Sequence, residues 1–263
     1  MDTRISHSGE RRRMRFHWLL LLLCALQLAV LSSPLQAKEE EPSWIIAPYV
    51  WGPDVKGDVG ISNVSVPMNV GLSELGSGVK LGAMGYVRWT HERTFLYAEG
   101  LGLDFKDKSF AAFFNQSVRS KVVLAEAGVG RHYRRDVTFP AKGTLQLSPY
   151  VGGRYTWLNV EASNPLQTLE ADDNWVDLAV GVMAEAPLYG RLSYVMKADA
   201  AGFGLSRDRY WNVIAGVQYP FTPSFVGIAA YRISRFDADQ GGGNDLDLNL
   251  RAAGPLLGLA YQF

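Results

Sequence analysis

The sequence has very little cysteine and no excess of either charge, and each shortage argues against a class of protein. Its only cysteine, Cys24, lies near the N-terminus, so no disulfide holds the rest of the chain together. The 26 basic and 26 acidic residues cancel, which removes the whole-chain electrostatic basis for binding nucleic acid. After residue 37 no uninterrupted apolar run has the length of a transmembrane helix. A helical membrane protein is therefore disfavoured.

The one long apolar run lies at the N-terminus and indicates an export signal. Several arginines precede an apolar segment over 18–31, and Ala37 precedes a run of glutamates. A basic region, a short apolar region and a small residue before a charged start are typical of a cleavable secretory signal. We expect cleavage after Ala37, with a signal peptide over 1–37 and a mature domain over 38–263. A single membrane anchor is the alternative, and Met14 is an alternative start.

The mature chain alternates apolar and polar side chains and has no helical stripe. In the clearest segment, 211–221, Trp211 and Val213 share one face and Asn212 and Gln218 share the other. Successive side chains of a strand point to opposite faces, so this period predicts β-structure. The same alternation occurs over 145–157, 176–188 and 192–200. We predict an all-β fold.

The placement of aromatic residues favours a membrane barrel over a secreted β-sandwich, which is the alternative. Aromatic side chains gather at the ends of the alternating segments, as in the interfacial girdles of outer-membrane barrels. The chain also ends on an alternating strand in which Leu257, Leu259, Tyr261 and Phe263 share one face. An exposed aromatic strand is of little use to a soluble protein, whereas a transmembrane barrel closes its sheet with such a strand.

The connections between segments predict a single antiparallel up-and-down barrel of ten strands, although eight or twelve strands remain open. Short connections are expected to face the periplasm and long ones to face outward. The first long connection contains an alternating stretch over 64–70 that indicates a hairpin beyond the membrane. The predicted spans are 44–54, 79–90, 94–105, 117–134, 144–159, 175–188, 191–203, 210–221, 224–236 and 249–263.

The alternation also assigns charged side chains to the barrel interior. They either pair and fill a narrow lumen, because unpaired buried charges are prohibitive, or line a path for solutes. Ten strands lie near the small end of barrel sizes, which favours a plugged lumen. The assigned residues are Lys80, Arg88, Glu126, Arg154, Asp177, Glu185, Lys197, Asp199 and Arg232.

One segment fits this assignment poorly. Over 94–105, Glu99 alternates in step with Phe95 and Tyr97, and we place this set against lipid. A carboxylate at the middle of the membrane costs free energy when it faces lipid. A bulge near Gly100 would turn Glu99 inward.

Three segments resemble a broad family of proteobacterial outer-membrane β-barrel proteins, and the resemblance spans essentially the whole mature chain. Its motifs are structural, so the resemblance implies a barrel in the outer membrane of a Gram-negative bacterium and implies no active site. An arginine expected near Met183 is absent, which weakens any inference about a shared charge network. Gly258, Tyr261 and Phe263 resemble the terminal signal read by the barrel assembly machinery. The segments are Trp44-x-x-x-Pro48-Tyr49-x-Trp51, Asn174-Trp175-Val176-Asp177 and Gly254-Pro255-x-x-Gly258-x-x-Tyr261-x-Phe263.

The sequence gives no support for an enzyme. The mature chain has two histidines, His91 and His132, and both are expected near the periplasmic side, away from the outer rim. No catalytic residue, metal site or cofactor is predicted. We expect a narrow channel or passive path for small solutes. The alternative is a plugged structural barrel whose outward loops contact partners. Expected partners are membrane lipid, lipopolysaccharide and the assembly machinery; the solute or protein partner is not identified.

Overall fold

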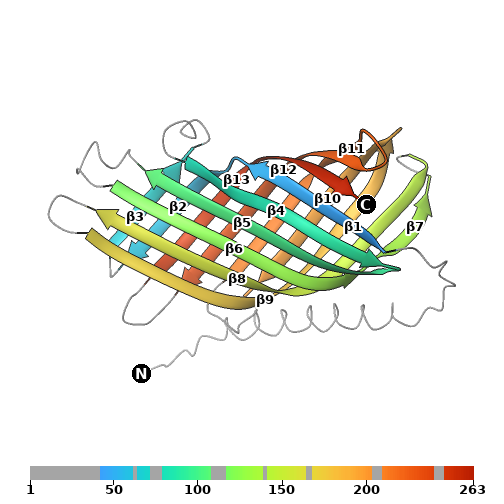
Figure 1. Cartoon of the computed structure of the whole chain (residues 1–263). Coiled ribbons are helices and arrows are strands. Elements are labelled where there is room, and N and C mark those ends of the chain that lie inside the picture. The colour runs from blue at the N-terminus through green and yellow to red at the C-terminus, as the bar shows by residue number, and fades with distance from the viewer. Residues whose placement is uncertain are drawn as a thin grey trace, which may run out of the picture. The chain divides into compact units, whose positions relative to one another are not determined.

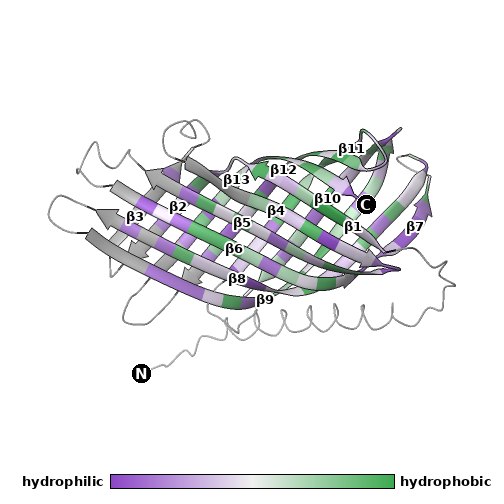
Figure 2. Cartoon of the chain, in the orientation of Figure 1, coloured by the Kyte–Doolittle hydropathy of each residue, from purple (hydrophilic) through white to green (hydrophobic). Residues whose placement is uncertain are grey.

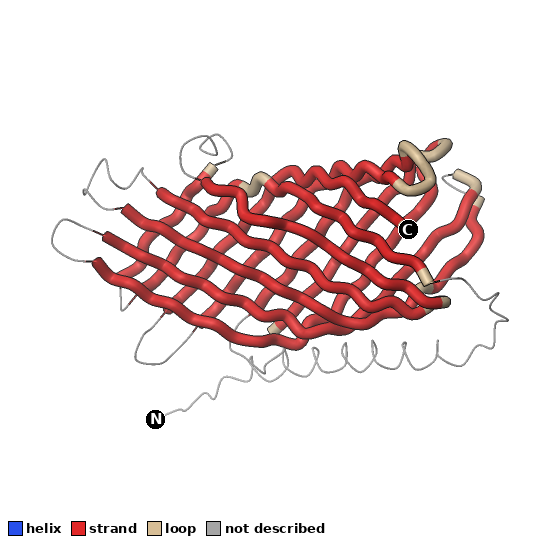
Figure 3. The backbone as a smooth tube through the Cα atoms, in the orientation of Figure 1, coloured by secondary structure: helices blue, strands red, loops and turns tan. Residues whose placement is uncertain are grey.

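The computed structural model describes residues 42–61, 64–71, 79–107, 117–138, 141–163, 168–202, 209–239 and 246–263, and these form one antiparallel sheet (Figures 1 and 3). Within these ranges, no helix is long and apolar enough to cross a membrane. The strands are β1 (Ser43–Trp51), β2 (Asp54–Ile61), β3 (Val64–Val70), β4 (Val79–His91), β5 (Thr94–Asp107), β6 (Ser117–Arg131), β7 (Tyr133–Val137), β8 (Gly143–Ser163), β9 (Thr168–Tyr189), β10 (Leu192–Ala201), β11 (Arg209–Pro220), β12 (Phe225–Asp239) and β13 (Leu246–Gln262).

Ten of these strands close the barrel, which confirms the predicted architecture. Each pairs with the next in the order β1, β4, β5, β6, β8, β9, β10, β11, β12 and β13, and β13 pairs back with β1. β7 continues β6 along the same partner, β8, and β2 continues β1 along β13. β2 and β3 form the hairpin expected at 64–70.

The hairpin of β8 and β9 is longer than predicted. Its strands stay paired from Gln146 and Glu185 to Ser163 and Thr168. The predicted strand spans end at 159 and begin again at 175, so the sequence predicts a long connection over 161–174. The prediction of a loop was wrong for most of this range. The backbone hydrogen bonds between two paired strands do not depend on apolar side chains, so the pairing continues beyond the membrane, where polar side chains face water.

A short break separates β1 from β2 and has a clear local cause. Pro53 has no N–H to donate to the ladder, while the N–H of Gly52 donates to the carbonyl of Pro255 at 3.0 Å. The backbone of β13 then passes so close that a Cβ on Gly254 would lie 1.9 Å from the carbonyl oxygen of Gly52. Only glycine at position 254 allows the two chains to meet here.

The barrel wall is apolar outside and carries buried charges inside, the reverse of a soluble protein. On the outer face Val176 is 68% exposed and Leu257 is 59% exposed, whereas Arg154 and Asp199 are buried inside. Figure 2 shows hydrophobic and hydrophilic residues in alternation along the strands. So large an exposed apolar surface is stable in lipid and not in water.

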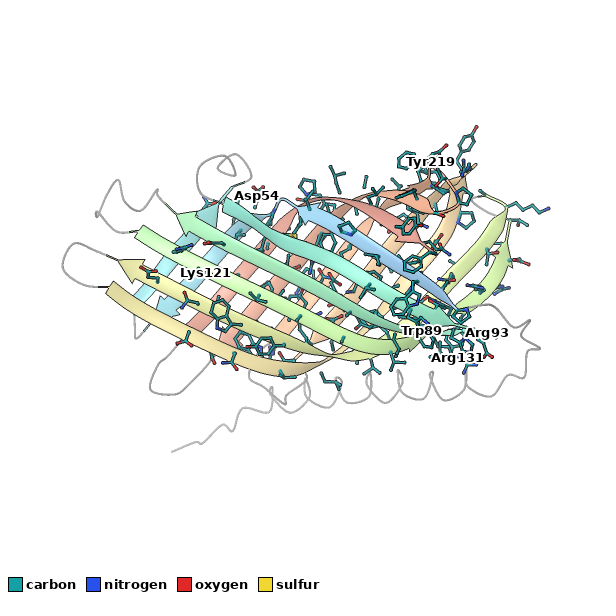
Figure 4. All side chains as sticks on the ribbon, viewed as in Figure 1. Asp54, Trp89, Arg93, Lys121, Arg131 and Tyr219 are labelled. Atoms are coloured by element: carbon teal, nitrogen blue, oxygen red, sulfur yellow. The ribbon has the colours of Figure 1, made fainter. Side chains whose placement is uncertain are left out.

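Aromatic and basic side chains gather at the end of the barrel that carries the short turns. Figure 4 shows Trp89, Arg93 and Arg131 together at this end, and Tyr219 at the same end of the barrel. Aromatic rings and snorkelling arginines at such a level mark the membrane interface. A closed antiparallel barrel with this exterior is the architecture of outer-membrane proteins. The protein is therefore an outer-membrane β-barrel of a Gram-negative envelope.

Candidate functional site

Six charged side chains from five strands meet in the barrel interior and form what we call the central ionic cluster. All six lie on the inward face of their strands, and the stagger of the barrel brings them to one level although they are far apart in sequence. Three are carboxylates and three are cations, so the cluster is formally neutral. Its members are Glu99 on β5, Glu126 on β6, Arg154 on β8, Lys197 and Asp199 on β10, and Arg232 on β12.

Arg154 joins two of the carboxylates. Its Nε donates to Glu126 Oε2 at 2.8 Å, and its Nη2 contacts both Glu126 and Asp199, the latter at 2.5 Å. The face of its guanidinium lies 3.9 Å from the ring centroid of Tyr210. Side-on pairing with a carboxylate and stacking on an aromatic ring are the contacts that suit guanidinium groups in buried positions.

Lys197 is surrounded by all three carboxylates of the cluster. Its Nζ bonds to Glu99 and lies 3.5 Å from Glu126 Oε1 and 3.9 Å from Asp199 Oδ2. The rings of Tyr97 and Tyr150, which contact each other edge to face, lie together on one side, with centroids 5.7 and 5.6 Å from Nζ. An ammonium in this position is compensated by charge and by the negative faces of two rings.

Arg232 completes the cluster on the far side of Glu99. Its Nη1 lies 3.3 Å from Glu99 Oε1, and its Nε donates to Asn212 Oδ1 at 2.9 Å. The guanidinium also lies 4.7 Å from the centroid of the Trp51 ring. Glu99 is thus paired with two cations, Lys197 and Arg232.

Tyrosine hydroxyls and one side-chain amide donate further hydrogen bonds to the carboxylate oxygens of the cluster. Tyr49 donates to Glu99 at 2.8 Å, and Tyr97 donates to Glu126 at 2.8 Å. Asp199 accepts from Asn212 Nδ2 at 2.8 Å and from Tyr150 at 3.3 Å. Buried charges are stable only with this degree of hydrogen bonding, because each carries a large desolvation penalty.

The cluster separates two cavities in the lumen. The outer cavity, toward the long connections, measures about 60 Å³ and has mainly apolar walls that include Trp51, Leu103 and Phe236. The inner cavity, toward the short turns, measures about 200 Å³ and is lined by Tyr86, Met183, Glu185 and others. Between them, a small cavity of about 10 Å³ lies at the cluster itself.

Five of the nine predicted lumen charges belong to the central ionic cluster, and three others lie elsewhere. Asp177 is buried in the wall of the outer cavity. Glu185 accepts from Gln218 Nε2 at 2.5 Å beside the inner cavity. Arg88 lies near the ring of Phe95, 5.9 Å from its centroid. The side chain of Lys80 lies outside the described part of the chain.

The assignment of the Glu99 face to lipid was wrong. Phe95 and Tyr97, which alternate in step with Glu99, are buried in the interior, and Leu96 on the opposite face is 49% exposed. Strand β5 pairs with β6 in unbroken register through Gly100, so no bulge turns Glu99. The strand presents most of its large side chains to the lumen, and its membrane face carries Leu96 together with small residues, Ala98 and Gly100.

Sequence reasoning also missed the hydrogen-bonding partners of the cluster. From the sequence alone, Tyr97 is placed against lipid and Tyr49 has no role beyond the family resemblance, yet both hydroxyls donate to carboxylates. Tyr150 and Asn212 were already on the inward faces of their predicted strands. The occurrence of inward-facing tyrosines and carboxylates on neighbouring strands was the signal that could have predicted these hydrogen bonds.

A buried histidine and serine lie together in the wall, and their surroundings do not resemble a catalytic pair. His132 Nδ1 and Ser148 Oγ are 2.8 Å apart, and the imidazole stacks on Phe95 with 4.6 Å between centroids. The charges that act on the ring are Arg88 and Arg134, both cationic. A general base needs a group that stabilises its protonated form, and cations do the opposite. His91 is exposed at the end of β4, next to the turn that leads to β5.

The C-terminal residues complete the seam of the barrel. The N–H of Trp44 donates to the carbonyl of Phe263 at 2.8 Å, and Phe263 returns a bond of 3.1 Å. The rings of Tyr261 and Phe263 are stacked on the lipid face, 5.5 Å apart. Gly258 lies on the inward face against Tyr49. Among the described residues, no group of histidine, cysteine and carboxylate side chains could hold a metal ion.

The sequence matches no protein-family model and no curated protein. Solved structures do match, among them a major outer-membrane protein of Thermus thermophilus (TM-score 0.40, 13% identity, 85% of this chain and 100% of that one). Another is Ail, the attachment invasion locus protein of Yersinia pestis (TM-score 0.39, 14% identity, 85% of this chain and 99% of that one). A third is an outer-membrane channel from Pseudomonas putida (TM-score 0.36, 11% identity, 88% of this chain and 99% of that one). Likeness at this level bears on neither function nor partner.

Proposed function

We propose that this barrel is non-enzymatic, that its lumen is closed at rest, and that it acts as a binding barrel and not as an open pore. The observation that supports this proposal is the central ionic cluster, which spans the lumen with its charges balanced and hydrogen-bonded. The open space of about 10 Å³ at the cluster is about that of a single water molecule. A hydrated ion does not fit there without displacing a paired side chain.

Single-channel recording on the refolded protein in planar bilayers tests the closed state. We expect no steady conductance from the wild type. Asp199→Ala, which removes a partner of Arg154 and Lys197, should produce open events. Asp172→Ala, which removes an exposed carboxylate from β9, is the matched control and should stay closed. A steady conductance from the wild type would contradict the proposal.

A second candidate is a path for small solutes. The observation that favours it is the pair of cavities on either side of one thin cluster, because a solute would need to displace only that layer. Swelling of proteoliposomes in small neutral solutes measures such a path independently of ion flow. Swelling by the wild type, absent with protein-free liposomes, would support the path over the closed barrel.

We also propose the export route inferred from the sequence, in which a signal peptide over 1–37 precedes a mature domain over 38–263. Residues 1–41 and parts of the long connections lie outside the described part of the chain. N-terminal sequencing of the protein from outer-membrane fractions should begin at Lys38. Membrane lipid, lipopolysaccharide and the assembly machinery remain its proposed partners, and Gly258, Tyr261 and Phe263 its proposed assembly signal. Recovery of folded protein in the soluble periplasm would contradict this route.

A further inference from the structure

The outer half of the lumen is lined by packed apolar side chains, as in a protein core, but it still contains a cavity. The interior of an outer-membrane barrel is usually polar, but here Leu101, Leu103, Leu124 and Leu158 pack into one buried apolar cluster with Trp51. These side chains lie on β1, β5, β6 and β8, and Trp175 on β9, Phe236 on β12 and Leu250 on β13 complete a ring around the lumen. A cavity of about 60 Å³ remains inside that ring. Apolar cavities of this kind exclude water and accept small apolar molecules.

Two hydrogen-bond donors in the wall of this cavity are left without a partner among the described residues. Trp51 Nε1 and Arg154 Nη1 are both buried and make no hydrogen bond, and both residues line the cavity. Arg154 uses its Nε and Nη2 on Glu126 and Asp199, so Nη1 is the part of the guanidinium left over. An unsatisfied buried donor costs free energy, so an acceptor atom is favoured here.

The charges around the cavity indicate that this acceptor belongs to a neutral molecule. The central ionic cluster below the cavity is already balanced, with three carboxylates against three cations. Asp177, a further carboxylate, is buried in the cavity wall. Arg209, also in the wall, is exposed, so water screens its charge. An anion would have to lose its hydration among mainly apolar walls, whereas a carbonyl oxygen would only accept from the two donors.

We propose that the outer cavity is a binding site for a small neutral molecule with an apolar body and one carbonyl-type oxygen. Its size is limited: 60 Å³ of cavity holds on the order of five water molecules, or about 150 Å³ of liquid. One six-membered ring with a small substituent fills that space. The inference rests on the proposed closed binding barrel, for which it names the ligand class.

Isothermal calorimetry on the refolded full-length mature barrel tests this with three probes. Acetophenone has the ring and the carbonyl, α-methylstyrene replaces the carbonyl oxygen with a CH₂ group of similar size, and benzoate carries a charge. We expect acetophenone to bind most tightly, about fivefold better than α-methylstyrene, which is the worth of one neutral hydrogen bond. Benzoate should bind weakest. Equal binding of the first two, or tightest binding of benzoate, would overturn the ligand class.

Two variants on neighbouring positions of β13 locate the site. Ala252 is buried in the cavity wall, and Ala253 lies on the opposite face of the same strand. Ala252→Phe fills the cavity and should abolish binding, while Ala253→Phe adds the same ring outside and should leave it unchanged. The Ala252→Phe protein in the same detergent also corrects for partitioning of the probes into micelles. Heat-modifiable gel mobility confirms that each variant is folded, and binding that survives in folded Ala252→Phe would overturn the site.

Trp51→Phe tests the donor while keeping an aromatic ring in the wall. We expect about a fivefold loss of acetophenone affinity and no change for α-methylstyrene. An equal loss for both probes would show that the ring, and not its N–H, carries recognition. Absence of binding by any probe, in a protein that still shows no conductance, would overturn this inference and leave the closed barrel intact.

Discussion

The central ionic cluster and the apolar outer half of the lumen adjoin each other, share Arg154, and are stabilised in opposite ways. The cluster has little free space, and almost every polar atom in it has a partner. The outer half has a cavity, two unpartnered donors and few polar atoms. A well-satisfied polar layer is rigid but sensitive to the loss of any member, whereas an underfilled apolar region tolerates added volume. The difference suggests that the cluster holds the barrel shut and that the outer half admits a ligand.

The largest effect is expected from breaking the cluster at Asp199. Asp199→Ala leaves Arg154 and Lys197 short of a buried partner and should lower the free energy of unfolding by about 3–5 kcal/mol. Urea unfolding in detergent measures the loss, with the exposed Asp172→Ala as control. A loss below about 1 kcal/mol, the range of exposed ion pairs, would mean that water reaches the cluster and that the lumen is open.

A smaller loss is expected from the apolar half. Leu101 is 4% exposed and packs in the ring around the outer cavity, so Leu101→Ala should cost about 2–4 kcal/mol. Leu257→Ala removes the same atoms from the lipid face, where acyl chains replace the lost contacts, and should cost less. Equal losses from the two substitutions in the same urea titration would argue that the outer half is not packed as a core.

The charge balance of the cluster predicts coupling between its members. Glu99→Gln and Lys197→Met each leave one uncompensated charge, but together they restore neutrality with Glu126 and Asp199 facing Arg154 and Arg232. The double variant should therefore be more stable than the sum of the single losses predicts, with an interaction energy of about 1–3 kcal/mol. A double-mutant cycle on unfolding free energies measures this. Strict additivity would contradict a shared network.

The smallest change in stability is expected at the end of the closing strand, where the exposed Phe263 belongs to neither interior region. Phe263→Ala removes an exposed ring on the lipid face and should change the unfolding free energy by no more than about 0.5 kcal/mol. Its yield in the outer membrane should nevertheless fall below that of Gln262→Ala, if the terminal aromatic is read during assembly. The amounts of the two variant proteins in outer-membrane fractions measure this difference. Equal amounts would contradict a role for Phe263 in assembly.

The alternation with a period of two in the sequence was sufficient to predict the strands, because successive side chains of every strand point to opposite faces. It does not by itself say which face is inside. For β5 the choice depended on size, and the larger side chains, Phe95 and Tyr97, were assigned to lipid although they fill the lumen. The charge of Glu99 contradicted that choice and was the better guide. A single carboxylate in an alternating set outweighs several apolar residues in that set.

The partners within the cluster could not be predicted in the same way. Lys197 and Glu99 are 98 residues apart, and they meet across the lumen only because the tilt and stagger of all the intervening strands bring them to one level. That geometry depends on the register of every pairing, including the register shift between β4 and β5. Local sequence patterns do not reveal the combined effect of all these registers on which residues meet across the lumen.

The seam between β1 and β13 has a consequence for the time course of folding. Other strand pairs join segments that are close in the chain, but this one joins the two ends of the domain, and β13 receives both β1 and β2. Closing so large a loop is slow and entropically costly, so β13 keeps an unpaired edge until late. An open edge recruits other chains. The interval before closure is therefore when this barrel is most prone to aggregate, and a chaperone that covers one strand would suffice to protect it.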